Sequence, residues 1–177
     1  ELRVHPTLIP AKRLIANVEG AMNAVQVQGD AVGTTLYYGK GAGAEPTASA
    51  VIADLVDVSR LQSADPAHRV PHLAFQPGSV VNTTIMPMGE VTTSYYLRLR
   101  VADVAGVLAD ITRVLADNGI SIDAMLQREA GDGENQTDLI MLTHETKEKN
   151  ILAAIAKIES LKTVEGSVTK IRLENLS

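Results

Sequence analysis

The clearest pattern in the chain is a strict alternation of apolar and polar residues over Tyr95–Val101. A period of two is typical of a half-buried β-strand. From Val104 to Leu115 the apolar positions then recur every three or four residues, which predicts an amphipathic helix. Asn118 and Gly119 tolerate a left-handed backbone and are expected to end that helix. The sequence therefore predicts a strand and a helix joined by a short turn that begins at Asp103.

The same two periods continue to Leu173. A second strand with one apolar face is predicted from four alternating residues: Ile120, Ile122, Ala124 and Leu126. Gly131–Gly133 turns the chain into a third strand over Thr137–Thr143. Thr146 is a candidate cap for a second helix, and Val164–Leu173 supplies the fourth strand.

The order strand, helix, strand, strand, helix, strand predicts an α+β fold, a ferredoxin-like βαββαβ sandwich with both helices on one face of an antiparallel sheet. The other face of the sheet is then uncovered. Because burial is marginal in a unit of roughly 80 residues, we expect this face to pair with a second copy. The prediction is a homodimer or a tetramer.

The first part of the chain predicts a hairpin and a helix. Strands are expected at Asn23–Gln28 and Thr34–Tyr38, and the glycine-rich loop Gly39–Thr47 leads into a helix that ends near Leu61. One apolar face of this helix is predicted from Val51, Ile52, Leu55 and Val58. Residues 62–94 contain several prolines and glycines and show no sustained period, which is typical of a linker. The predicted regions are therefore 1–61, 62–94 and 95–177.

Composition excludes several classes of protein. The 177 residues carry a net charge of −5, which argues against a nucleic-acid surface. With no cysteine, disulfides and thiolate chemistry are excluded. We find no apolar run of bilayer length and no signal-peptide pattern, so no membrane partner and a cytoplasmic location are expected. The chain starts without Met in what reads as mid-strand, which predicts a fragment of a longer protein.

The turn Asp103–Leu108 is the main candidate site. The N-terminus of a helix offers free N–H groups to a carboxylate, and Asp103 is suited to face an ammonium group, so a small zwitterion fits here. The alternative is a plain turn and helix start. The loop Gly39–Thr47 is likewise either a structural turn or a ligand-binding loop. His68 and His72 are four residues apart, but Pro71 disfavours the continuous helix that a metal pair needs, and no metal site is predicted.

Three segments resemble bacterial homoserine dehydrogenases. Tyr37–Val51 is similar to the segment that returns to the cofactor domain of that family, and Val4–Pro10 and Pro87–Glu90 are similar to other parts of it. The C-terminal region resembles the ACT domain that many bacterial members carry. The resemblance covers essentially the whole chain.

The resemblance implies the C-terminal portion of an oxidoreductase that interconverts homoserine and aspartate semialdehyde with NAD or NADP. It implies that 1–61 completes the catalytic and cofactor-binding region and that 95–177 is an ACT regulatory domain. The N-terminal Rossmann domain of the family, its glycine fingerprint and its catalytic residues have no counterpart here, so no catalytic residue is assigned and the chain alone is expected to be inactive. The alternative is a free-standing amino-acid-binding or dimerisation module.

The resemblance also implies two sets of site residues. Gly41, Ala42 and Gly43 become candidates for close approach to the nicotinamide end of the cofactor. Threonine becomes the expected effector of the ACT domain. Its site is expected to combine a turn with a helix end from the neighbouring copy, namely Asp103, Val104, Ala105, Gly106, Val107 and Leu108 with Asn118, Gly119 and Ile120.

Overall fold

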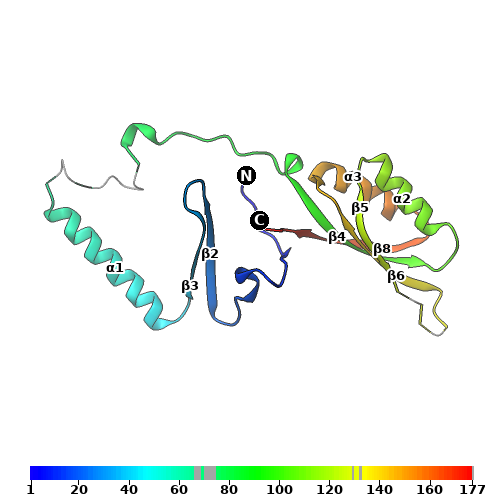
Figure 1. The fold of residues 1–177 in the computed structure, drawn as a ribbon, viewed down its shortest axis with the longest axis horizontal. Coiled ribbons are helices and arrows are strands. Elements are labelled where there is room, and N and C mark those ends of the chain that lie inside the picture. Colours follow the sequence, from blue (N-terminus) through cyan, green and yellow to red (C-terminus); the bar gives the residue numbers. More distant parts are fainter. Residues whose placement is uncertain (66–68, 70–74, 129, 132, 177) are drawn as a thin grey trace. The chain divides into compact units, whose positions relative to one another are not determined.

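The structure is a computed structural model that describes residues 1–65, 69, 75–128, 130–131 and 133–176 (Figure 1). His68, Pro71, His72 and Asp132, named above, lie outside the described residues. The chain forms two compact units: Glu1–Pro10 with Thr84–Ser177, and Ala11–Thr83. The sequence pattern divided the chain consecutively at 61 and 94. In the structure the first ten residues instead group with the C-terminal region, because a short strand near the N-terminus joins the C-terminal sheet.

The first unit contains the predicted βαββαβ order. Its elements are β1 (Thr7–Leu8), η5 (Met88–Glu90), β4 (Thr92–Ala102), α2 (Val107–Asp117), β5 (Ile122–Gln127), β6 (Gln136–Thr143), β7 (Thr146–Lys147), α3 (Glu148–Glu159) and β8 (Val164–Leu173). The sheet order is β1-β8-β4-β6-β5, and β7 pairs with the start of β4. The four long strands are antiparallel, whereas β1 runs parallel to β8. This arrangement confirms the predicted α+β ferredoxin-like fold.

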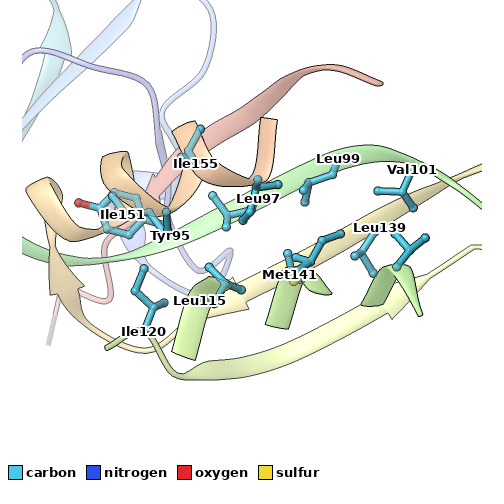
Figure 2. Close-up of a cluster of buried hydrophobic side chains, with 14 residues drawn as sticks. Tyr95, Leu97, Leu99, Val101, Leu115, Ile120, Leu139, Met141, Ile151 and Ile155 are labelled. Atoms are coloured by element: carbon cyan, nitrogen blue, oxygen red, sulfur yellow. The ribbon is translucent and has the colours of Figure 1, made fainter. Parts of the chain in front are cut away.

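The core of this unit lies between the sheet and both helices (Figure 2). Alternate residues of β4 from Tyr95 to Val101 are at most 3% exposed, and Leu139 and Met141 of β6 are equally buried. The helices add apolar side chains that pack against them: Val107, Ile111, Leu115, Ile151, Ala154, Ile155 and Ile158. Since all the buried sheet residues lie on one side of the pleat, both helices cover that side and the other face of the sheet is uncovered.

Strand β5 differs from the prediction. The register between β5 and β6 shifts between Ile122 and Ala124, as a β-bulge does. Ile122 therefore pairs with the buried Thr143, whereas Ala124 and Leu126 pair with residues on the uncovered face. Leu126 is 55% exposed. The prediction that these residues share one apolar face was wrong, because an extra residue in the bulge reverses the alternation.

The predicted cap of the second long helix was also wrong. Thr146 lies in β7, opposite Thr93 of β4, and is buried. Lys147 occupies the N-cap position of α3, with no side-chain hydrogen bond to the helix end. Pairing with β4 uses the backbone at Thr146, and the helix cap lies one residue later than predicted.

The second unit contains η1 (Leu14–Asn17), a hairpin of β2 (Met22–Gly29) and β3 (Gly33–Lys40), helix α1 (Ala44–Ser63) and η4 (Pro77–Ser79). The hairpin and the helix match the prediction. No residue of α1 is buried. The four residues of its predicted apolar face, Val51, Ile52, Leu55 and Val58, are 53%, 59%, 57% and 53% exposed.

Candidate effector site and glycine loop

The turn between β4 and α2 is built by hydrogen bonds at both of its ends. The Asp103 N–H donates to the Asn135 carbonyl at 2.9 Å, where β4 ends. Gly106 precedes the helix with φ 98° and ψ −22°, a conformation that favours glycine. Asp110 N–H donates to the Gly106 carbonyl at 3.0 Å and closes the first helical turn. The N–H groups of Val107, Leu108 and Ala109 therefore have no partner within the helix.

A cavity of about 220 Å³ lies at this turn. Five of its lining residues are predicted site residues: Val104, Ala105, Gly106, Val107 and Leu108. The wall is completed by Val101, Ala102, Leu139 and Gln127. No side chain caps the start of α2, so its first N–H groups remain available beside the cavity. The cavity thus combines unpaired backbone donors, an apolar wall and one side-chain amide.

Gln127 is a lining residue that sequence reasoning missed. It ends β5 and pairs in register with the buried Leu139. The register therefore places it on the helix side of the sheet, beside the turn. The alternation over Ile120–Leu126 predicted that Gln127 lies on the opposite face, because it took no account of the bulge. The sequence around Gln127 carries no local signal for this placement.

The other predicted effector residues lie elsewhere within the chain. Asp103 is exposed and does not line the cavity. Asn118, Gly119 and Ile120 lie at the opposite end of α2, where the Asn118 side chain donates to the Val114 carbonyl at 2.6 Å. Gly119 has φ 70°, and Ile120 is 4% exposed. Their contribution from a neighbouring copy stays a prediction.

The glycine loop joins β3 to α1 in the second unit. A Cβ atom at Gly41 would lie 2.5 Å from the Asn23 side-chain nitrogen, so glycine allows the two strands' ends to approach. Gly43 is the N-cap of α1 with φ 121°, which a side chain would strain. Ala42 is exposed. The loop offers backbone groups for close approach, but it follows an antiparallel hairpin strand rather than the parallel strand of a dinucleotide-binding βαβ unit.

Comparison with known proteins assigns both regions. The sequence model of the homoserine dehydrogenase family matches residues 1–56, and that of the ACT domain matches residues 95–163. Homoserine dehydrogenase from Neisseria gonorrhoeae is 57% identical over 176 residues, and that from Pseudomonas aeruginosa is 53% identical over 177 residues. A crystal structure of a homoserine dehydrogenase from Thiobacillus denitrificans is 68% identical, with a TM-score of 0.89 over 99% of this chain.

The chain is homologous to the C-terminal portion of homoserine dehydrogenases. It spans about 40% of the length of the curated relatives it matches, and 39% of the Thiobacillus denitrificans chain. The C-terminal region of the chain matches the ACT domain over residues 95–163. The resemblance stated from Tyr37–Val51 and the βαββαβ pattern is thereby confirmed.

The main cluster of charged side chains in the ACT domain ties strands β4 and β8 to helix α3. The Glu148 carboxylate is 4% exposed and accepts a hydrogen bond from the Tyr95 hydroxyl at 2.6 Å. It also pairs with Lys170 and, at 2.7 Å, with Arg172. Burial alone would raise the pKa of Glu148, but the hydrogen bonds from Lys170, Tyr95 and Arg172 outweigh it and lower this pKa. Burial and the Glu148 carboxylate raise the pKa of Tyr95.

Two kinds of feature are absent from the part of the chain that the structure describes. Among the described residues, no group of three or more His, Asp or Glu side chains is placed to hold one metal ion. No helix formed by the described residues has the length and apolar character to cross a membrane.

Proposed function

We propose that this chain is the C-terminal portion of a functional homoserine dehydrogenase, which interconverts L-homoserine and L-aspartate 4-semialdehyde with NAD or NADP. Support comes from 53–57% identity to two curated homoserine dehydrogenases over almost the whole chain. The match over residues 1–56 disfavours a free-standing ACT module, which has no use for that region. The nicotinamide cofactor supplies the hydride acceptor when bound.

The residues present fit the cofactor only in part. The Asn23 side chain fills the space beside Gly41, whereas Gly43 has no such neighbour and the start of α1 adds unpaired N–H groups beside it. These groups suit contact with one end of the cofactor. The loop supplies no βαβ turn to hold the pyrophosphate, so that role falls to residues outside this chain.

We further propose that the ACT domain binds a small amino acid at the cavity between β4 and α2. In keeping with the family resemblance, this amino acid is the pathway end product threonine. The observation that carries this proposal is the meeting of free helix N–H groups with the Gln127 amide across a cavity of about 220 Å³. That volume lies below the range of roughly 300–1,000 Å³ typical of drug-sized ligands. A small amino acid is therefore a suitable occupant.

Each group of threonine has a proposed partner. Its carboxylate accepts from the N–H groups of Val107 and Leu108, where the helix dipole adds about 0.3–1 kcal/mol. Its hydroxyl bonds to Gln127, and its methyl group contacts the apolar wall at Leu139. Asp103 adjoins the lining residue Val104 in sequence, and its carboxylate meets the ammonium group at the rim.

Calorimetry of the 177-residue chain with threonine, serine and valine tests this site. We expect heat with threonine, weaker heat with valine, which lacks the hydroxyl, and loss of the threonine–valine difference in Gln127→Leu. Gly106→Val should abolish binding, since φ 98° does not suit valine. Asn118→Ala changes the other end of α2. Unchanged threonine heat in this variant supports a site within one chain, whereas reduced heat supports a site shared between copies. Absence of threonine heat at millimolar concentration contradicts the effector role and leaves the homology to homoserine dehydrogenase intact.

We also propose that the uncovered face of the ACT sheet pairs with a second copy. Ile140 and Leu142 of β6 alternate with the buried core residues and are only half-buried, and Leu126 of β5 is exposed beside them. These three apolar side chains gain burial when another sheet covers them. A homodimer, or a tetramer made of such dimers, follows.

A further inference from the structure

Two segments connect the ACT-containing unit to the inserted unit Ala11–Thr83, one held by strand β8 and the other by the start of helix α3. The first segment ends at Pro10 and contains β1, whose Thr7 and Leu8 pair with Arg172 and Leu173 of β8. The Glu174 N–H also donates to the Leu8 carbonyl at 3.1 Å. Further out, Arg3 forms a 2.9 Å ion pair with Glu174. The first segment is thus held along the C-terminal end of β8.

The second segment returns at Thr84 and is held by the first turn of α3. Glu90 in η5 pairs with Lys147 and with Lys149, each at 2.7 Å. The Glu148 N–H donates to the carbonyl of Val91, a fully buried residue, at 2.9 Å. Three consecutive residues, 147–149, therefore hold the segment that leads into β4.

Glu148 links these two attachments. Its buried carboxylate pairs with Arg172 at 2.7 Å, and Arg172 is the β8 residue opposite Thr7 of β1. Its backbone N–H holds the second segment at Val91. Glu148 thus joins β8, with which β1 pairs, to the second segment at Val91. The side chains of Lys170 and Arg172 are only 19% and 13% exposed, so they depend on this carboxylate for charge compensation.

We propose that the first turn of α3 is a joint that fixes both connections at once, with Glu148 as its positioning residue. A disturbance of this turn loosens β1 and η5 together. Both segments continue covalently into Ala11–Thr83. Loosening of the joint therefore affects both connections to the inserted unit. This role is separate from effector binding and does not rest on it.

Hydrogen exchange of the 177-residue chain, measured by mass spectrometry on peptides, tests the joint. The readout is the exchange rate in residues 3–9 and 88–95, each divided by the rate in β6. In Glu148→Gln we expect both ratios to rise about tenfold or more, since local opening sets these rates. Glu90→Gln should raise the ratio only for 88–95, and Arg3→Ala only for 3–9. Glu145→Gln, an exposed acid three residues before Glu148, is the matched control and should change neither.

Because Glu148→Gln also lowers global stability, exchange in β6 rises as well. The proposal is overturned if only one of the two segments rises in Glu148→Gln, or if neither segment rises by more than β6 does. If Glu148→Gln does not fold, Tyr95→Phe replaces it, because that change removes the 2.6 Å hydrogen bond to Glu148 and keeps the ring. Both ratios should then rise by a smaller factor. A Tyr95→Phe chain with both ratios at the wild-type value also rejects the joint.

Discussion

The Tyr95 hydroxyl donates a 2.6 Å hydrogen bond to the Glu148 carboxylate inside the core of the ACT domain. The tyrosine belongs to β4 and the glutamate to the first turn of α3, so the bond ties sheet to helix. Lys170 and Arg172 supply the positive charges that this buried carboxylate requires. Four residues from three elements therefore depend on one another.

Replacing Glu148 should be costly because it leaves two poorly exposed cations without their partner. We expect Glu148→Gln to lower the free energy of unfolding by about 3–5 kcal/mol. Glu145→Gln should change it by less than about 0.5 kcal/mol, since that side chain is exposed. Urea denaturation at neutral pH measures both values. A loss below 1 kcal/mol in Glu148→Gln, roughly that of an exposed ion pair, contradicts the account of the cluster.

The same carboxylate predicts an acid limit to stability. The pKa of Glu148 is lower in the folded chain than its ordinary value of 4.5, so its stabilisation is present above pH 4.5 and is lost as the pH falls through the folded pKa. Thermal unfolding followed from pH 7 downward should show the wild type losing stability below pH 4.5. The Glu148→Gln chain should show a flatter profile over that window. Equal slopes would assign the acid loss to other carboxylates.

The apolar core predicts a contrast between two leucines. Leu99 is 1% exposed, and Leu99→Ala should cost about 2–5 kcal/mol, since it removes buried methyl groups and leaves a cavity. Leu152 on α3 is 49% exposed, and Leu152→Ala should cost well under half as much. Chemical denaturation of both variants checks the difference. Similar losses at the two positions are incompatible with the described packing.

The uncovered sheet face predicts self-association. Light scattering should give the mass of a dimer or a larger assembly for the wild type, and Leu142→Arg should shift it toward the monomer by placing charge on that face. Leu152→Arg, on the helix side of the same domain, is the control and should not change the mass. A wild-type monomer at micromolar concentration would reject pairing through this face.

Hydride transfer should be absent from the 177-residue chain. Dehydrogenase chemistry requires the nicotinamide to be held and oriented against the substrate, and the glycine loop lies after a hairpin strand that provides no pyrophosphate turn. Mixing the chain with homoserine and NADP or NAD should leave the nicotinamide absorbance unchanged. The complete Neisseria gonorrhoeae relative serves as the positive control. Turnover by a pure preparation of the chain would show that its own residues suffice.

Sequence periodicity predicted the long elements because local patterns determine them. Val164–Leu173 was placed to the residue, and alternate residues of Tyr95–Val101 lie in the core as predicted. The predicted apolar face of α2 supplies Val107, Ile111 and Leu115 to the core, whereas Val104 is exposed and precedes the helix. Features that depend on distant partners were missed. The bulge near Ile122 needs the register with β6, and β1 is only two residues long, so neither has a period of its own.

The candidate site shows the same division. Val104–Leu108 could be found from the sequence because a glycine before an amphipathic helix marks a helix start. Gln127 is 21 positions from Gly106 and reaches the cavity only through sheet pairing, so no local signal could place it there. No prediction was made for Glu148 from the sequence, because only the fold shows that Lys170 and Arg172 surround it.

Strand β1 has a practical consequence for cutting and exchanging this domain. A chain trimmed to start at Thr84 would keep the βαββαβ elements. It would lose β1, so the outer edge of β8 at Arg172 and Leu173 would have no paired strand. An open strand edge is a template for pairing with other chains, so the trimmed domain should be more prone to aggregate than the complete one. Grafting the ACT domain between relatives therefore requires Glu1–Pro10 to travel with it as a second piece, although 73 residues separate the two in sequence.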